Sequence, residues 1–231
     1  MSARIDLDDA RDGRIAAVCA GLLIATQVAG KATRDALFLS NFPVERLPLM
    51  VGAAGIVSLI LVVVASRLLR NLGPIRLVPR ALMLSALVLV ALGAAAARSP
   101  KLVAVAVFLH LAVLGGVLVS GFWSALNERF DPRAARQRFG RIALGGTVGG
   151  LLGGLVAERL AALSSASAIL VALGFLHLAC AILLTRIPDP GRHSDAPGPA
   201  PAPAKGSWRE LLRMGYLRNL ATLVLIVTVA G

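Results

Sequence analysis

Long apolar runs separated by short polar segments account for most of the chain. A helix needs about 20 residues to cross a hydrocarbon core of roughly 30 Å. Six runs reach that length, at residues 15–40, 47–66, 77–97, 102–126, 142–163 and 166–185. The pattern therefore predicts an all-α, polytopic membrane protein built around a six-transmembrane-helix bundle.

The sequence also predicts a second part beyond a polar segment. The Pro, Ala and Gly content of residues 186–207 cannot bury a core and favours an extended linker. A seventh apolar run begins near Leu217. Its continuous apolar part, residues 220–231, has only 12 residues, about 18 Å of helix, which is too short to cross the hydrocarbon core. We therefore expect a piece of a longer protein that lacks a second, C-terminal six-helix half. The expected divisions are a tail, the six-helix part, the linker and the start of that second half, at residues 1–14, 15–185, 186–207 and 208–231.

The composition agrees with a helical membrane protein. Hydrophobic residues make up 57% of the chain and aromatic residues 4%, and the mean hydropathy is +0.80. An ordinary soluble domain is less apolar than this. A barrel with aromatic girdles would need more aromatic residues, so closely packed helices are favoured.

The basic residues predict the orientation of the spans. The chain has 24 Lys and Arg against 12 acids, a net charge of +12, which in a soluble protein would suggest nucleic acid. However, 18 of the 24 lie in the tail and in the second, fourth and sixth connections, and 6 lie on the other side. The positive-inside rule then places the N-terminus and the linker in the cytoplasm. The expected partner is the lipid bilayer and not nucleic acid.

A polar stripe runs along the first span. Gln27, Lys31, Arg34, Asp35 and Phe38 recur at helical spacing, so they share one face. Ionisable groups inside a span often mark a substrate path, and two cations suit an anionic ligand, with Asp35 as their counter-ion when the ligand is absent. In the alternative, Lys31 and Arg34 reach the outer headgroups and Asp35 neutralises one of them.

A second candidate face lies on the fourth span. Gly116, Ser120, Trp123 and Asn127 fall at helical spacing and form a small-to-polar face. The position of Trp123 near the cytoplasmic end of the span is typical of an aromatic residue at the membrane interface. Stacking on a purine or closing a cytoplasmic gate is the alternative. We include Trp123 and Asn127 among the candidate substrate-binding residues.

Small residues recur every four positions in the fifth span. This pattern permits close approach of helix backbones and predicts a tight packing seam, with a sliding surface between two conformations as the alternative. The residues are Gly145, Gly149, Gly150, Gly153 and Gly154. No phosphate-loop signature accompanies them.

The remaining polar positions suggest no chemistry. His110 and His177 lie inside spans without acidic neighbours in sequence, so hydrogen-bonded packing is favoured over a proton relay. Cys19 and Cys180 lie in apolar runs and are expected to be buried hydrophobes. The sequence contains no catalytic motif and no metal-ligand spacing. We therefore expect no enzymatic activity, no metal and no cofactor.

The chain resembles the ATP/ADP translocase (nucleotide transporter) family, a branch of major facilitator-like carriers of intracellular bacteria and plastids. The first-span segment KATRDALFLS at 31–40 carries most of this resemblance. Further likeness comes from Leu47-Pro48, Phe122-Trp123 with Asn127, and RAARQRFG at 133–140. The fifth-span glycines also resemble the antiporter motif of major facilitator proteins, with Gly150 where proline is usual.

This resemblance implies twelve spans, alternating access and exchange of nucleotides or related anions. It implies that Lys31 and Arg34 contribute to the substrate site, although Ala32 stands where the nucleotide carriers tend to have an acid. We expect a multi-pass carrier of the bacterial inner membrane for an anionic solute, with a nucleotide as the specific candidate. The alternative is a non-transporting membrane anchor or sensor module, and a second one is a half-carrier that works as a parallel homodimer.

Overall fold

The computed structural model describes residues 2–130, 132–163 and 165–187, together with the single positions 215, 219 and 222. Contacts divide the chain into two units, Met1–Pro190 and Gly191–Gly231. All the helices described below belong to the first unit. The expected linker from residue 188 onward, and most of the expected seventh span, lie outside the described residues.

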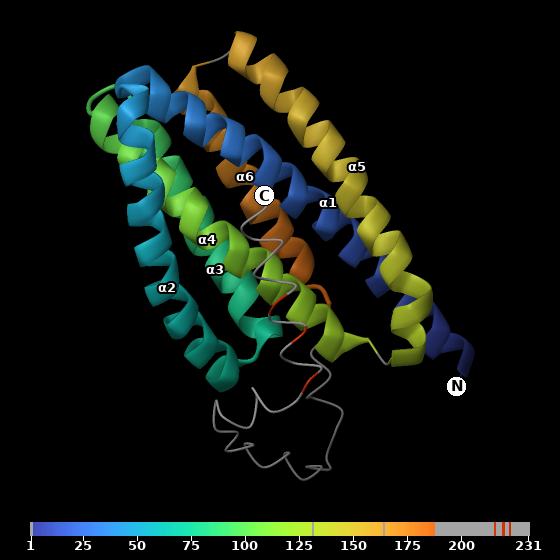
Figure 1. Ribbon diagram of the computed structural model, residues 1–231. Coiled ribbons are helices and arrows are strands. Elements are labelled where there is room, and N and C mark those ends of the chain that lie inside the picture. Colours follow the sequence, from blue (N-terminus) through green and yellow to red (C-terminus); the bar gives the residue numbers. More distant parts are fainter. Residues whose placement is uncertain are drawn as a thin grey trace. The chain divides into compact units, whose positions relative to one another are not determined.

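The first unit is helical, which confirms the predicted fold class (Figure 1). Its elements are α1 (Ser2–Asn41), the short 3-10 helix η1 (Val44–Arg46), α2 (Leu47–Leu72), α3 (Pro74–Ala95), α4 (Pro100–Arg129), α5 (Pro132–Leu163) and α6 (Ala166–Leu184). Within the described ranges there is no strand. Six helices are long and apolar enough to cross a membrane.

Helix starts follow local rules, but the second and fourth connections are shorter than the sequence pattern predicted. Pro74, Pro100 and Pro132 each stand at the first position of a helix, where the missing N–H costs nothing. Gly73, with φ 72°, separates α2 from α3, and a left-handed residue there suits glycine. The polar residues expected in the connections therefore extend the helices instead, because hydropathy marks where a helix leaves the bilayer and not where its hydrogen bonding stops.

The N-terminal helix also begins earlier than the first predicted span. α1 starts at Ser2, whereas the apolar run starts at Ile15. Asp12 is only 3% exposed although the sequence placed it in a surface tail. Its carboxylate pairs with the guanidinium of Arg129 at the end of α4. This contact ties α1 at Asp12 to the end of α4.

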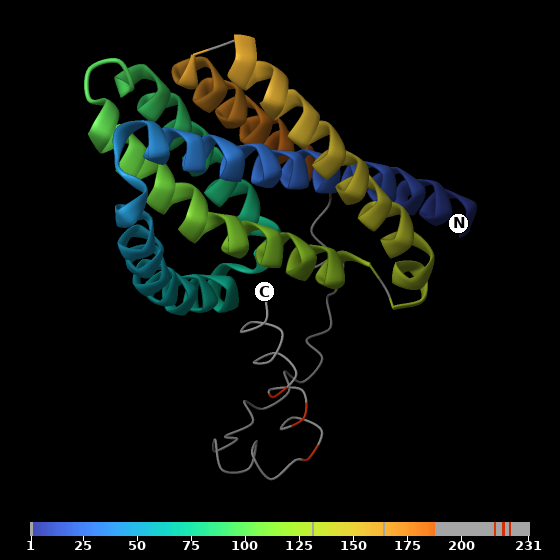
Figure 2. The ribbon, with the colours of Figure 1, turned by 45° about the horizontal axis from the view of Figure 1, so that its top comes forward.

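Helix α1 contacts α4, α5 and α6, while α3 packs against α4 and α6. α2 packs mainly on α4, and α5 packs along α1 with little contact to α6; Figure 2 shows α5 beside α1 from a second direction. Only 6% of the apolar window of Val44–Leu72 is buried, against 39% for Ala10–Asn41. α1 is therefore central to the bundle and α2 peripheral.

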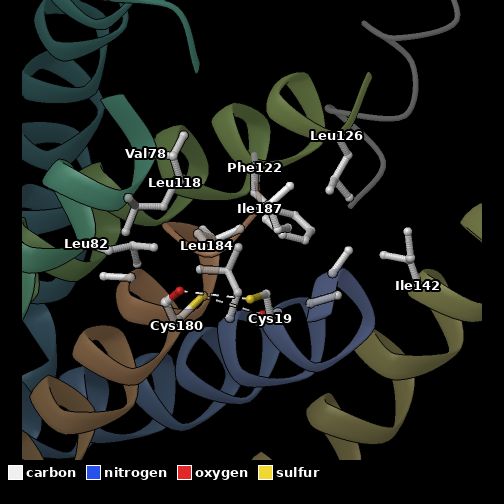
Figure 3. Close-up of a cluster of buried hydrophobic side chains, with 14 of the residues drawn as sticks. Cys19, Val78, Leu82, Leu118, Phe122, Leu126, Ile142, Cys180, Leu184 and Ile187 are labelled. Carbon is white, nitrogen blue, oxygen red and sulfur yellow. Dashed lines mark hydrogen bonds between the residues drawn. The ribbon is translucent and has the colours of Figure 1, made fainter. Parts of the chain in front are cut away.

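The largest apolar cluster joins α1, α3, α4 and α6, with Ile142 of α5 at its edge (Figure 3). Cys19 and Cys180 face each other across α1 and α6, and both are fully buried free thiols. The Sγ of Cys180 lies 3.7 Å from the carbonyl oxygen of Cys19. The thiols thus act as small packing residues, as the sequence led us to expect.

Candidate functional site

The charged residues of α1 form a structured group with α4. The Nε of Arg34 donates to Oδ1 of Asp35 at 2.8 Å, and the two side chains are 19% and 47% exposed. The Cζ of Arg34 lies 4.5 Å from the ring centroid of Phe108 in α4. Phe108 is buried and packs on Phe38, 5.2 Å between centroids. A carboxylate and an aromatic face therefore hold the guanidinium in one place, which sequence spacing alone did not indicate.

Lys31 and Gln27 continue the same stripe along α1. Lys31 is exposed, and none of the described acidic side chains pairs with it. The Oε1 of Gln27 lies so close to Gly115 of α4 that a Cβ there would overlap it. Gly115 thus makes room for the amide. The group around Arg34 carries two positive charges and one negative charge, so it has an excess of one positive charge.

Trp123 and Asn127 lie further along α4. Trp123 packs edge-on against Phe122 and Phe139, with centroid distances of 5.7 and 5.8 Å. It lines a hollow of about 280 Å³ between α1, α4 and α5, where Ile24 and Thr147 also lie. Asn127 is exposed.

The six candidate residues do not form one cluster. Arg34 lies against Phe108 of α4. Trp123 is fifteen positions further along the same helix, roughly 22 Å at 1.5 Å per residue. A small solute cannot contact Arg34 and Trp123 together. The structure instead divides the candidates into a charged group with Gln27, Lys31, Arg34 and Asp35, and a second group at the far end of α4.

Three glycines of α5 lie directly against the backbone of α1. A Cβ at Gly145 or Gly149 would overlap the carbonyl oxygen of Ala17 or Gly21. At Gly153 it would lie 2.6 Å from both Cα and O of Ala25. The facing residues on α1 are themselves small and also four apart, so two small-residue ladders meet.

The other two glycines on the predicted seam meet side chains and not backbone. A Cβ at Gly150 would lie 3.2 Å from Ile24 Cγ2, and one at Gly154 would lie 3.7 Å from Val28 Cγ1. The α1 backbone is therefore closest along the line of Gly145, Gly149 and Gly153.

The sequence reasoning missed the ion pair between Asp12 and Arg129. One signal was available, because Asp12, Ala16, Cys19 and Leu23 recur at helical spacing and would place an acid on an apolar face. All four are buried in the structure. A buried acid needs a partner, and only the tertiary structure shows that Arg129 supplies it.

The two histidines share one partner. Ser85 Oγ lies 2.9 Å from His110 Nε2 and 2.9 Å from His177 Nδ1, which ties α3, α4 and α6 together. Ser85 and His177 are buried. Since a hydroxyl has one donor, Ser85 donates to one ring and accepts from the other. The contacts agree with the packing interpretation favoured from the sequence.

Replacing Ser85 with alanine is expected to lower the free energy of unfolding by about 1–3 kcal/mol, because both imidazoles lose their partner in an apolar interior. Thermal unfolding in detergent measures the effect. Ser124→Ala is the matched control, since Ser124 Oγ bonds only to the Ser120 carbonyl of its own helix. Equal unfolding temperatures of the two variants would show that the Ser85 bonds contribute nothing.

The described residues contain no group of three or more His, Cys, Asp or Glu able to hold a metal ion.

No curated protein and no solved structure matches the chain. A sequence model described as Major Facilitator Superfamily matches residues 16–231. Together with the six apolar helices of the first unit, this match over most of the sequence shows that the chain belongs to the Major Facilitator Superfamily, whose members are typically membrane transporters rather than enzymes.

Proposed function

We propose that this membrane transporter carries an anionic solute, which binds on α1 at Lys31 and Arg34. The observation that carries the proposal is the fixed position of Arg34, held by Asp35 and the Phe108 ring, with an unpaired Lys31 one turn before it. Asp35 accepts from Nε of Arg34. The two terminal nitrogens of the guanidinium can therefore donate hydrogen bonds to two oxygens of a carboxylate or phosphate. Gln27 would add a hydrogen bond one turn further along.

Asp35 is the counter-ion of this proposed site. In the absence of solute it keeps Arg34 neutralised, because an unpaired charge within the membrane is costly. A bound anion would then compete with Asp35 for the guanidinium and also neutralise Lys31. Binding and release would thus exchange one ion pair of Arg34 for another, and the bound anion would balance the excess positive charge of the group.

The distances favour a compact anion over a nucleotide as the proposed substrate. Because Trp123 lies roughly 22 Å from Phe108 along α4, a compact anion suits the charged group without contacting Trp123. A nucleotide, suggested by the resemblance to the nucleotide carriers, would need to extend along α4 to reach Trp123 and Asn127. Otherwise these two residues would act at a gate and not in the binding site.

The proposed mechanism is alternating access in the bacterial inner membrane, with exchange of one anion for another. The excess of Lys and Arg on one side supports a cytoplasmic N-terminus. Alternating access requires a second six-helix bundle that rocks against this one, and the Gly145–Gly154 ladder would serve as a sliding contact. The second bundle belongs to the proposal and is not among the described residues.

Counterflow into liposomes that contain the full-length protein tests the substrate class. The labelled solutes are inorganic phosphate, a dicarboxylate, ATP and a neutral sugar. We expect uptake of at least one anion and none of the sugar. Uptake of the sugar alone would refute the anionic site, and uptake of no solute would favour an anchor or sensor.

A further inference from the structure

Helices α1 and α4 contact each other in one antiparallel register. Three contacts along this seam share it, since the residue number falls on α1 as it rises on α4: Arg34 with Phe108, Gly30 with Leu111, and Gln27 with Gly115. The seam therefore holds two polar groups of α1 against α4, the Arg34 guanidinium and the Gln27 carboxamide. Lys31 lies between them along α1.

The Gln27 carboxamide lies directly on the backbone of α4. A Cβ at Gly115 would overlap Oε1 of Gln27 and would lie 3.2 Å from its Cδ and 3.3 Å from its Nε2. The Gln27 side chain is half-buried, and it makes no hydrogen bond within the described part of the bundle. Gly115 thus fixes where the amide lies, while the amide keeps its hydrogen-bonding groups for another partner.

Gly115 differs from the glycines of α5 in what it contacts. The atoms nearest to a Cβ at Gly115 all belong to the end of one side chain, whereas a Cβ at Gly149 meets the backbone of α1. The end of a glutamine side chain can rotate away, and alanine is favoured over glycine inside a helix. Gly115→Ala should therefore displace the Gln27 amide and leave the packing of α1 on α4 intact.

The two polar groups are too far apart for one small group of a solute to contact both. Phe108 and Gly115 are seven positions apart on α4, roughly 10 Å at 1.5 Å per residue. A hydrogen bond spans only about 3 Å. A solute that contacts the Arg34 guanidinium and the Gln27 amide together must therefore carry two separate polar groups.

We propose that Gln27, positioned by Gly115, binds a neutral polar group of the solute, about 10 Å along the seam from the Arg34 guanidinium. This inference rests on the proposed anion site at Lys31 and Arg34. It narrows the substrate to an elongated anion with a hydroxyl or carbonyl group distant from its negative charge. A carboxamide has both donors and an acceptor, so it can bind either group. Gly115 is a positioning residue, because it acts only through the amide.

The test compares two competitors that differ by one hydroxyl group. Counterflow of labelled inorganic phosphate, a dicarboxylate and ATP is measured in liposomes that contain the full-length protein. Unlabelled butyrate and 4-hydroxybutyrate then compete with the labelled anion that is taken up. We expect 4-hydroxybutyrate to inhibit the wild type at about fivefold lower concentration than butyrate, as one hydrogen bond between neutral groups provides.

Gly115→Ala and Gln27→Ala are each expected to abolish this preference for 4-hydroxybutyrate. The double variant should behave like Gln27→Ala alone, because Gly115 has no amide left to position. Butyrate contacts only the charged group, so it should inhibit these variants as it inhibits the wild type. Gln27→Asn keeps the amide but shortens the side chain by one methylene group, and it should also lose the preference.

Gly55→Ala is the matched control for the change of glycine to alanine. Gly55 lies inside α2, and a Cβ there would meet no atom of the described residues within 4 Å. This variant should keep the preference for 4-hydroxybutyrate. Gly55→Ala and Gly115→Ala should both unfold at or above the wild-type temperature.

The proposal is overturned if the wild type does not prefer 4-hydroxybutyrate, or if Gly115→Ala keeps the preference. A further change in the double variant beyond Gln27→Ala would show that Gly115 acts through another group. Failure of Gly115→Ala to fold would show that this glycine serves helix packing instead. These outcomes leave the proposed anion transport intact, whereas uptake of none of the three labelled anions would refute both proposals.

Discussion

Gly149→Leu is expected to prevent the protein from folding into its native bundle. Even a Cβ at this position would overlap the carbonyl oxygen of Gly21, and it would lie 2.5 Å from the Gly21 carbonyl carbon. Ordinary overpacking costs about 1–3 kcal/mol. Here the obstacle is the backbone of α1 at Gly21, which cannot move aside as a side chain can. We expect the loss of monodisperse protein after extraction in mild detergent, measured by size-exclusion chromatography.

The alanine series makes this prediction quantitative. Gly149→Ala should lower the unfolding temperature clearly, whereas Gly154→Ala should leave it unchanged or raise it. A Cβ at Gly154 meets Val28 at 3.7 Å, an ordinary contact, and alanine is favoured over glycine in a helix by about 1 kcal/mol. If Gly149→Ala unfolds at the wild-type temperature, the two backbones are further apart than the structure places them.

The second large effect concerns transport. Arg34→Ala in the full-length protein is expected to lower the affinity for the anionic solute by about 10-fold to 150-fold, because hydrogen bonds to charged groups are worth roughly 1.5–3 kcal/mol. It would also leave Asp35 without its partner. The measurement is the solute concentration that gives half-maximal counterflow in liposomes.

Arg98→Ala is the control for this variant. Arg98 is an exposed arginine between α3 and α4, outside the charged group of α1. The Arg98→Ala variant should transport the solute with wild-type affinity. Arg34→Lys keeps the charge and loses the planar fork, so an intermediate affinity would show that geometry matters as well as charge. Wild-type affinity in Arg34→Ala would remove this residue from the site, while loss of folded protein would show that the Asp35 and Phe108 contacts serve stability instead.

Several features could be predicted because they depend on local pattern. Runs of about 20 apolar residues indicate spans wherever they occur, so the helical class and the six spans followed directly. Membership of the major facilitator superfamily was expected from short motifs, and the family match confirms it at that level. The finer likeness to nucleotide carriers and the division of the chain beyond residue 187 stay predictions.

The candidate site was harder to predict, because its geometry depends on contacts between helices. Spacing placed Gln27, Lys31 and Arg34 on one face, but the Phe108 ring that holds Arg34 comes from α4. The sequence also suggested Trp123, near the cytoplasmic end of the fourth span, as a residue that stacks on a purine of the same substrate. The antiparallel run of α4 separates Trp123 from these charges instead, since residues at its two ends lie at different depths in the bundle.

The amino-acid pattern alone predicted the membrane-spanning segments, the small residues that permit close packing and the charges that share one helix face, since each follows from the period of a single helix. What those faces meet depends on the packing of the helices. Only that packing pairs Asp12 with Arg129 and places the α5 glycines on Ala17, Gly21 and Ala25. Side chains far apart in sequence meet only once the helices have packed, and no single-helix pattern contains that information.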